Sequence, residues 1–318
     1  MKKIFEFKKQ RSIDEIIEGS FQFFRTHIKK ILQILWQYNA ILIIGLMSSY
    51  FLYNYFYFGS FNSLFTKSGQ EDLVLQNYGP KFLVVAFALF VFSFFFFPRF
   101  FATVLGYIRV YMENDGHVLP EKVQVYVKGK FWGLIGITFL LVGMIALAGL
   151  FFFILLGISK SIGSILMLLF IFPAFFYLTV YATLLFYVYF FEDTNITETF
   201  VKTKNYIKHR FWFSFWTIFI LGLIVGILGA IFNAPIMIYA FIKGIMMTKE
   251  TGMTQYAQQG DLFISAISVL SYIGQLVLKV LNIIGIALLY FSVREYHTHE
   301  SVLEKIDQIG KETTSYDN

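Results

Sequence analysis

Long apolar runs separated by short charged segments dominate the hydrophobic pattern of this chain. A transmembrane helix needs about 20 mostly apolar residues, and six stretches reach that length. They cover residues 31–58, 82–108, 132–158, 164–191, 212–242 and 262–292. Several exceed the minimum, which favours tilted helices, and Pro98, Pro173 and Pro235 are candidate kinks. The pattern predicts an all-α integral membrane protein with about six transmembrane helices.

Three charged segments share one plan, in which a short amphipathic helix and a basic cluster precede an apolar span. They begin near Ser12, Leu119 and Asn195. Ser12 with Glu15, and Asn195 with Glu198, have the spacing of a helix-capping pair. One face of the first helix, residues 12–30, carries Ile13, Ile16, Ile17, Phe21, Phe24 and Ile28. We expect this helix to lie along the cytoplasmic face with its apolar residues turned inward.

The spans that return to the cytoplasm also resemble one another. The block around Pro98 (Phe-Phe-Pro-Arg-Phe-Phe) matches the block around Pro173 (Ile-Phe-Pro-Ala-Phe-Phe). Together with the recurring amphipathic segments, this predicts three units, each an amphipathic helix followed by a transmembrane hairpin. The alternative is that apolar spans look alike through composition alone, and we favour the repeat because matched proline blocks are harder to obtain by chance.

Lysine and arginine are distributed unequally between the two sides of the predicted spans. Nineteen of these residues lie in 1–30, 109–130, 202–210 and the segment after 293, against five in the alternate connections. Short loops rich in Lys and Arg stay in the cytoplasm. We therefore expect a multi-pass protein of the cytoplasmic membrane with both termini in the cytoplasm. The expected divisions are a basic segment with an interfacial helix (1–30), a six-helix membrane domain (31–292) and a cytoplasmic tail (293–318).

Composition supports the membrane assignment and excludes several kinds of functional site. Apolar residues make up 57% of the chain and charged residues 14%, whereas soluble domains carry roughly 25% charged residues. The chain has no cysteine, which excludes disulfides and thiolate sites. The net charge of +6 belongs to the segments beside the spans, so we expect no nucleic-acid partner. No metal site, cofactor or catalytic constellation is predicted.

A resemblance to a known family rests on two of the amphipathic segments. The strings SIDEIIEGSFQFFRTHIKKIL and NITETFVKTKNYIKHRFWFSFW resemble recurring segments of the glycerophosphoryl diester phosphodiesterase membrane-domain family. This resemblance implies a multi-helical bacterial membrane domain. The family is named after a catalytic barrel that is sometimes fused to such domains, and no region here is long enough to form one. The resemblance therefore implies membrane topology and not hydrolysis.

Two bases inside the predicted spans are candidate binding residues. Ionisable residues at membrane depth are costly and are often functional, and the six spans contain Arg99 and Lys279 but no Asp or Glu. One interpretation is a shared pocket for a phosphate or carboxylate group. The other, which we favour, is that each base bonds freed carbonyls or neighbouring polar groups, or reaches towards an interface.

A pair of small residues in the fifth span is a candidate packing face. Gly222 and Gly226 are separated by one helical turn, a spacing that lets helices approach closely. The contact can lie within the chain or between chains, and we favour the first.

These features lead to three functional hypotheses. The leading one is a non-enzymatic scaffold or assembly factor that contacts membrane lipids and other membrane proteins. The alternative is a carrier of a lipid or an anionic solute that uses Arg99 and Lys279. A lipid-modifying enzyme is the third and least favoured, because the sequence shows no nucleophile and base at catalytic spacing.

Overall fold

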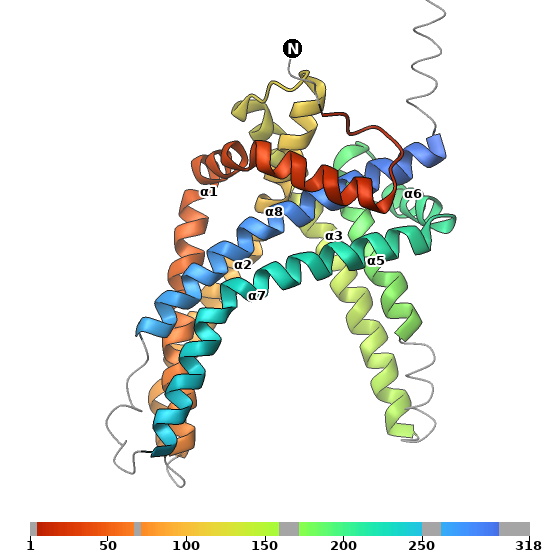
Figure 1. Ribbon diagram of the computed structural model, residues 1–318. Coiled ribbons are helices and arrows are strands. Elements are labelled where there is room, and N and C mark those ends of the chain that lie inside the picture. Colours follow the sequence, from red (N-terminus) through yellow and green to blue (C-terminus); the bar gives the residue numbers. More distant parts are fainter. Residues whose placement is uncertain (1–4, 67–70, 159–171, 250–261, 299–318) are drawn as a thin grey trace, which may run out of the picture. The chain divides into compact units, whose positions relative to one another are not determined.

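The computed structural model describes residues 5–66, 71–158, 172–249 and 262–298, and these residues form helices and no strand. Figure 1 labels the helices in chain order. They are α1 (Ile13–Thr66), α2 (Glu71–Glu113), α3 (Pro120–Ile158), α5 (Phe172–Phe191), α6 (Ile196–Lys208), α7 (Phe211–Lys249) and α8 (Leu262–Thr298). Residues 164–171 of the predicted fourth span and 299–318 of the predicted tail lie outside the described residues.

Six of these helices are long and apolar enough to cross a membrane: α1, α2, α3, α5, α7 and α8. Each overlaps one of the six spans predicted from the sequence. The all-helical fold and the number of candidate spans are therefore confirmed for the described part of the chain. They indicate a multi-pass membrane protein. The predicted three-part division at residues 30 and 292 stays a prediction.

The amphipathic segment and the first span form one uninterrupted helix, α1, of 54 residues. Its start has the capping geometry predicted from the sequence, because the backbone N–H of Ser12 donates to the Glu15 carboxylate at 3.0 Å. The second predicted cap differs. Asn195 occupies the position before α6, but its side chain makes no capping hydrogen bond.

The face of α1 that packs against the protein is not the one expected from the apolar pattern. Ile16 is fully buried, as are Ser20, Phe23 and Ile31. The other five residues of the predicted face are only half-buried: Ile13, Ile17, Phe21, Phe24 and Ile28. At roughly 100° per residue the apolar positions span an arc wide enough for two different neighbours. The protein core occupies one side of that arc.

Two residues in left-handed conformations form the turn between α2 and α3. Asp115 has φ 47° and Gly116 has φ 87°. The N–H of Gly116 donates to the carbonyl of Tyr111 at 2.9 Å, which satisfies one of the carbonyls left open at the end of α2. Glycine adopts this conformation without a steric penalty, so the turn ends α2 and starts the chain towards α3.

Two of the three candidate kink prolines lie well inside continuous helices. Pro98 is inside α2 and Pro235 inside α7, while Pro173 is the second described residue of α5. A proline removes one helical hydrogen bond, and long membrane helices tolerate that loss when neighbours satisfy the freed carbonyl. The prolines therefore do not divide these spans into separate helices.

The chain divides into two compact units. Unit 1 contains residues 1–31, 102–222 and 281–318, and unit 2 contains residues 32–101 and 223–280. The described part of unit 1 has a dense core of buried aromatic and aliphatic side chains. Its largest fully buried members are Phe7, Ile16, Phe23, Ile31, Tyr107, Tyr187, Phe190, Tyr290 and Phe291.

Unit 2 is built from apolar helix segments that touch through rings and small residues. Tyr50 stacks on Tyr272 with ring centroids 4.5 Å apart. Gly45 lies against Phe92, and Gly274 lies against Phe232. Many large apolar side chains of this unit stay exposed, among them Ile41, Phe87 and Ile231. Such a surface is stable where lipid takes the place of water.

Candidate functional site

The two predicted intramembrane bases lie on α2 and α8, within unit 2. The Lys279 Nζ is 4.4 Å from the centroid of the Phe97 ring, and Phe97 precedes Arg99 by two residues. Lys279 is exposed and Arg99 is half-buried. A lysine over an aromatic face is attracted by the ring electrons, which is a structural role that needs no bound anion. Anion binding by Arg99 and Lys279 stays a prediction.

The predicted small-residue face of α7 is open in the described part of the chain. A Cβ added at Gly222 or Gly226 would meet no atom within 4 Å. Other glycines make the close contacts instead. A Cβ at Gly285 would lie 2.8 Å from a methyl carbon of Leu221, and Gly133 packs against the Tyr189 ring. Sequence spacing alone did not distinguish these glycines, because the large side chain opposite each one comes from another helix.

The first polar cluster of unit 1 is centred on Asp193, just after α5. Its carboxylate accepts hydrogen bonds from Arg109 Nη2 at 2.6 Å and Nη1 at 3.1 Å, and lies 2.9 Å from Lys130 Nζ. Arg109 also donates to Glu113 at 3.0 Å. The hydrogen bond from Arg109, helped by Lys130, holds the pKa of Asp193 well below its usual range. The cluster joins α2, α3 and the segment after α5.

The second polar cluster is centred on the neighbouring residue, Glu192. Its Oε1 accepts from Tyr206 Oη at 2.7 Å and from Tyr290 Oη at 2.9 Å, and its Oε2 lies 3.1 Å from Lys202 Nζ. His297 Nε2 is 3.1 Å from the Tyr206 carbonyl. This cluster joins the end of α5 to α6 and α8.

Both clusters have the composition of an acid–base site but the geometry of a structural junction. The carboxylates of Glu192 and Asp193 each contact three donor atoms of the same unit, which uses most of the roughly four lone-pair sites of a carboxylate. Within the described residues no group of three or more His, Asp or Glu side chains could hold a metal ion. These clusters therefore hold the helices of unit 1 together.

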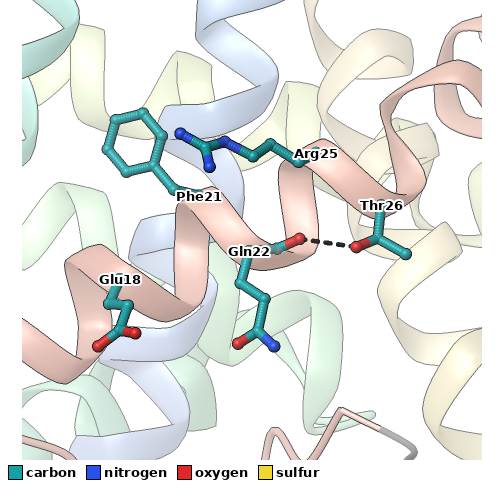
Figure 2. Close-up of a pocket in the computed structure, with 5 residues that line it drawn as sticks. All are labelled: Glu18, Phe21, Gln22, Arg25 and Thr26. Atoms are coloured by element: carbon teal, nitrogen blue, oxygen red, sulfur yellow. Dashed lines mark hydrogen bonds between the residues drawn. The ribbon is translucent and has the colours of Figure 1, made fainter. Parts of the chain in front are cut away.

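A surface groove runs along the amphipathic part of α1. It has a volume of about 560 Å³ and is lined by Glu18, Phe21, Gln22, Arg25 and Thr26. Figure 2 shows these side chains projecting from one stretch of the helix, with Glu18 and Gln22 extending to the same side. Thr26 Oγ1 donates to the Gln22 carbonyl at 2.9 Å. The groove thus offers an acid, an amide and a base beside an aromatic ring.

A second groove, in unit 2, has a different character. It has a volume of about 540 Å³ and is lined by Met47, Ser48, Phe51, Leu52, Ala266 and Val269. A single serine hydroxyl is the polar side chain among these residues. A groove of this composition fits hydrocarbon and offers no charged recognition, so the groove on α1 is the better candidate site.

All four tryptophans of the chain are exposed: Trp36, Trp132, Trp212 and Trp216. Three of them follow a basic cluster closely, since Lys30 precedes Trp36, Lys128 precedes Trp132 and Lys208 precedes Trp212. These three lysines are exposed as well. Tryptophan and the basic residues both favour the membrane–water boundary, so these pairs mark a boundary-type surface within α1, within α3 and where α6 is followed by α7.

The sequence predicted that residues 13–30 are helical, but it did not predict the clusters around Glu192 and Asp193. Two adjacent acids directly after an apolar run were the available signal. Their partners could not be deduced, because Arg109 lies 84 residues before Asp193 in the chain and Tyr290 lies 98 residues after Glu192. Such pairings depend on how helices associate and not on local spacing.

Comparisons with known proteins identified no relative of this chain. No family model, curated protein or solved structure matched the chain. The resemblance to the glycerophosphoryl diester phosphodiesterase membrane-domain family therefore stays a proposal.

Proposed function

We propose that this chain is a non-enzymatic scaffold or assembly factor of the cytoplasmic membrane, which contacts lipids and other membrane proteins. The observation that supports the proposal is that some polar residues bond within the protein while other polar and aromatic residues are exposed. The carboxylates of Glu192 and Asp193 are used to join helices of unit 1, whereas the tryptophans and the basic residues beside them face outward. A partner can therefore contact the exposed tryptophans and basic side chains, whereas the two carboxylates are already bonded within unit 1.

The proposed topology has both termini in the cytoplasm and the starts of α1, α3 and α7 at the cytoplasmic boundary. The unequal distribution of Lys and Arg supports it. The exposed pairs Lys30 with Trp36, Lys128 with Trp132 and Lys208 with Trp212 also support it, because in each pair an exposed tryptophan follows an exposed lysine by four to six residues.

The proposed architecture is three hairpins, each preceded by an amphipathic helix. In α6 the buried residues are Thr199, Thr203 and Ile207, which recur at helical spacing on one face. At the start of α3, Val123 and Val127 are buried in the same way. These one-sided faces suit helices that lie against a protein core while their other side meets headgroups or water.

Reporters of membrane sidedness test the topology. Fusions after Lys130, Arg210 and Asn318 should behave as cytoplasmic, and reporters within residues 60–80 or 248–260 as external. A C-terminal fusion that behaves as external would contradict both the span count and the placement of the basic surfaces.

Photo-crosslinking in native membranes tests the scaffold function against the carrier alternative, in which Arg99 and Lys279 bind an anionic solute. A crosslinker at exposed Trp132 or Trp212 should give discrete adducts with lipids and defined membrane proteins. One at Leu134, which is buried, should give none. If adducts are absent and Arg99→Gln with Lys279→Gln abolishes uptake of an anion into proteoliposomes, the carrier hypothesis replaces the scaffold.

A further inference from the structure

The amphipathic part of α1 has three distinct faces. Ile16 and Phe23 hold the first face against the core of unit 1. The second face carries half-buried apolar side chains that include Phe21 and Phe24. The third carries Glu18, Gln22 and Arg25, which line the groove. At roughly 100° per residue, Phe21 lies at the border between the apolar and polar faces.

The charged residues of the groove are available to a ligand. Within the described residues, neither the Glu18 carboxylate nor the Arg25 guanidinium forms an ion pair. The two residues are seven positions apart, or about 10 Å along the helix axis, which is beyond the spacing of helical ion pairs. Gln22 lies between them in the sequence and extends to the same side of the helix as Glu18, while Arg25 extends towards Phe21 (Figure 2). The Gln22 amide offers both a donor and an acceptor.

This arrangement recognises a ligand that is positive at one end and negative at the other. A cationic group fits beside Glu18, and an anionic oxygen group fits beside Arg25, whose planar fork matches phosphate. Hydrocarbon fits along Phe21 and the apolar face next to it. A purely anionic headgroup would leave Glu18 without a counter-charge and close to the ligand's own charge.

We propose that the groove on α1 binds the headgroup of a zwitterionic aminophospholipid, with the ammonium at Glu18 and the phosphate at Arg25. Its acyl chains then follow the half-buried face that contains Ile17, Phe21 and Phe24. This inference rests on the proposed placement of α1 at the cytoplasmic boundary, and it names the class of lipid that the helix recognises there.

The ammonium is preferred to a choline group because it can donate hydrogen bonds. A primary ammonium offers three donors to the Glu18 carboxylate and the Gln22 amide oxygen. A trimethylammonium group offers none and is usually bound by several aromatic rings, whereas Phe21 is the one aromatic residue among the described residues that line this groove.

Native mass spectrometry of the delipidated full chain tests the inference. The probes are phosphatidylethanolamine, phosphatidylcholine and phosphatidylglycerol with identical acyl chains. We expect phosphatidylethanolamine to bind about three- to tenfold more tightly than either of the others, as charge-assisted hydrogen bonds at an exposed site allow. Equal binding of the ethanolamine and choline lipids would overturn the proposal.

Matched variants test which residue contacts each end of the lipid headgroup. Glu18→Gln should remove the preference for phosphatidylethanolamine over phosphatidylcholine while the binding of both continues. Arg25→Gln should weaken the binding of all three lipids. Lys29→Gln, a charge change on the same face but outside the groove, should leave the preference unchanged. If Glu18→Gln keeps the preference, or Lys29→Gln removes it as strongly, the recognition does not reside in this groove.

A depth measurement separates failure of this inference from failure of the proposed placement. Because the chain has no cysteine, Phe24→Cys and Gln22→Cys each give a single site for a spin label. A label at 24 should lie in the membrane and one at 22 nearer to water. If both are in water, the placement of α1 is wrong and the inference fails with it. If the depths are as expected but the lipids bind equally, the inference fails alone.

Discussion

Unit 1 and unit 2 are stabilised by different kinds of contact, although both contain segments of α1, α2, α7 and α8. In unit 1, charged residues such as Arg109, Asp193 and Glu192 connect segments that are distant in sequence. Apart from the contact of Lys279 with the Phe97 ring, the contacts described for unit 2 run through aromatic rings, amides and a hydroxyl. Gln275 donates to the Asn233 side chain at 2.9 Å, and Ser271 donates to the Phe232 carbonyl at 2.5 Å.

The acids of unit 1 that make these contacts directly follow α5, whereas the hydrogen bonds of unit 2 lie within apolar helices. Ions are retained where several partners satisfy them and water is within reach, because an unpaired charge in lipid is costly. Lipid tails provide no hydrophobic drive for helices to associate, so helices at membrane depth rely on close packing and neutral hydrogen bonds. The contacts at Gly274 and Gly45 in unit 2 follow that rule.

The largest expected effect is the loss of the Glu192 carboxylate. Its side chain is 8% exposed and serves two tyrosines and Lys202. Glu192→Ala should lower the free energy of unfolding by about 3 kcal/mol, since buried donors lose their acceptor. Thermal unfolding in mild detergent measures the change.

Glu198→Ala is the matched control, because Glu198 also approaches Lys202, at 3.7 Å, but is 55% exposed. It should cost about 0.5 kcal/mol or less, as for other exposed helical pairs. Equal effects of the two substitutions would mean that the Glu192 cluster does not support unit 1 as described.

A smaller effect is expected from overpacking in unit 2. A side chain at Gly274 would overlap the Phe232 ring, so Gly274→Leu should cost about 2 kcal/mol through strained packing. Gly226→Leu should change stability little, because the space beside Gly226 is open. The same unfolding assay on both variants tests this contrast. A strong loss at Gly226 would instead show that the predicted small-residue face is a real packing surface.

The smallest expected effect is a pH dependence that originates at Asp193. Its lowered pKa means that the unfolded chain takes up the proton first as the pH falls. The stabilisation is therefore complete above the usual aspartate pKa of about 3.9 and is lost as the pH falls towards the lower folded-state pKa. Because this side chain is 64% exposed, we expect about 1 kcal/mol.

Comparing the wild-type chain with Asp193→Asn at pH 7 and pH 3 measures this contribution. The variant should be less stable at pH 7, and the difference should shrink at pH 3. A difference that stays constant between the two pH values would show that the carboxylate charge is not its source.

The membrane class, the number of spans and most helix positions could be predicted from the sequence. The reason is that burying an apolar helix in lipid depends on its own composition and length. The start of α1 was also predictable, because Ser12 and Glu15 are neighbours in one turn. The candidate groove was partly foreseeable, since Glu18, Gln22 and Arg25 lie within two turns of the same helix.

The tertiary structure decided which side of α1 packs against the core and which charged residues meet. The sequence predicted one broad apolar face on α1, but only the side that contains Ile16 and Phe23 is buried in the core. Likewise, Gly274 packs tightly while Gly226 is open, and Asp193 meets Arg109 from far along the chain. Local periodicity determines what a helix can bury, but the neighbour that fills each position is set by association of segments distant in sequence.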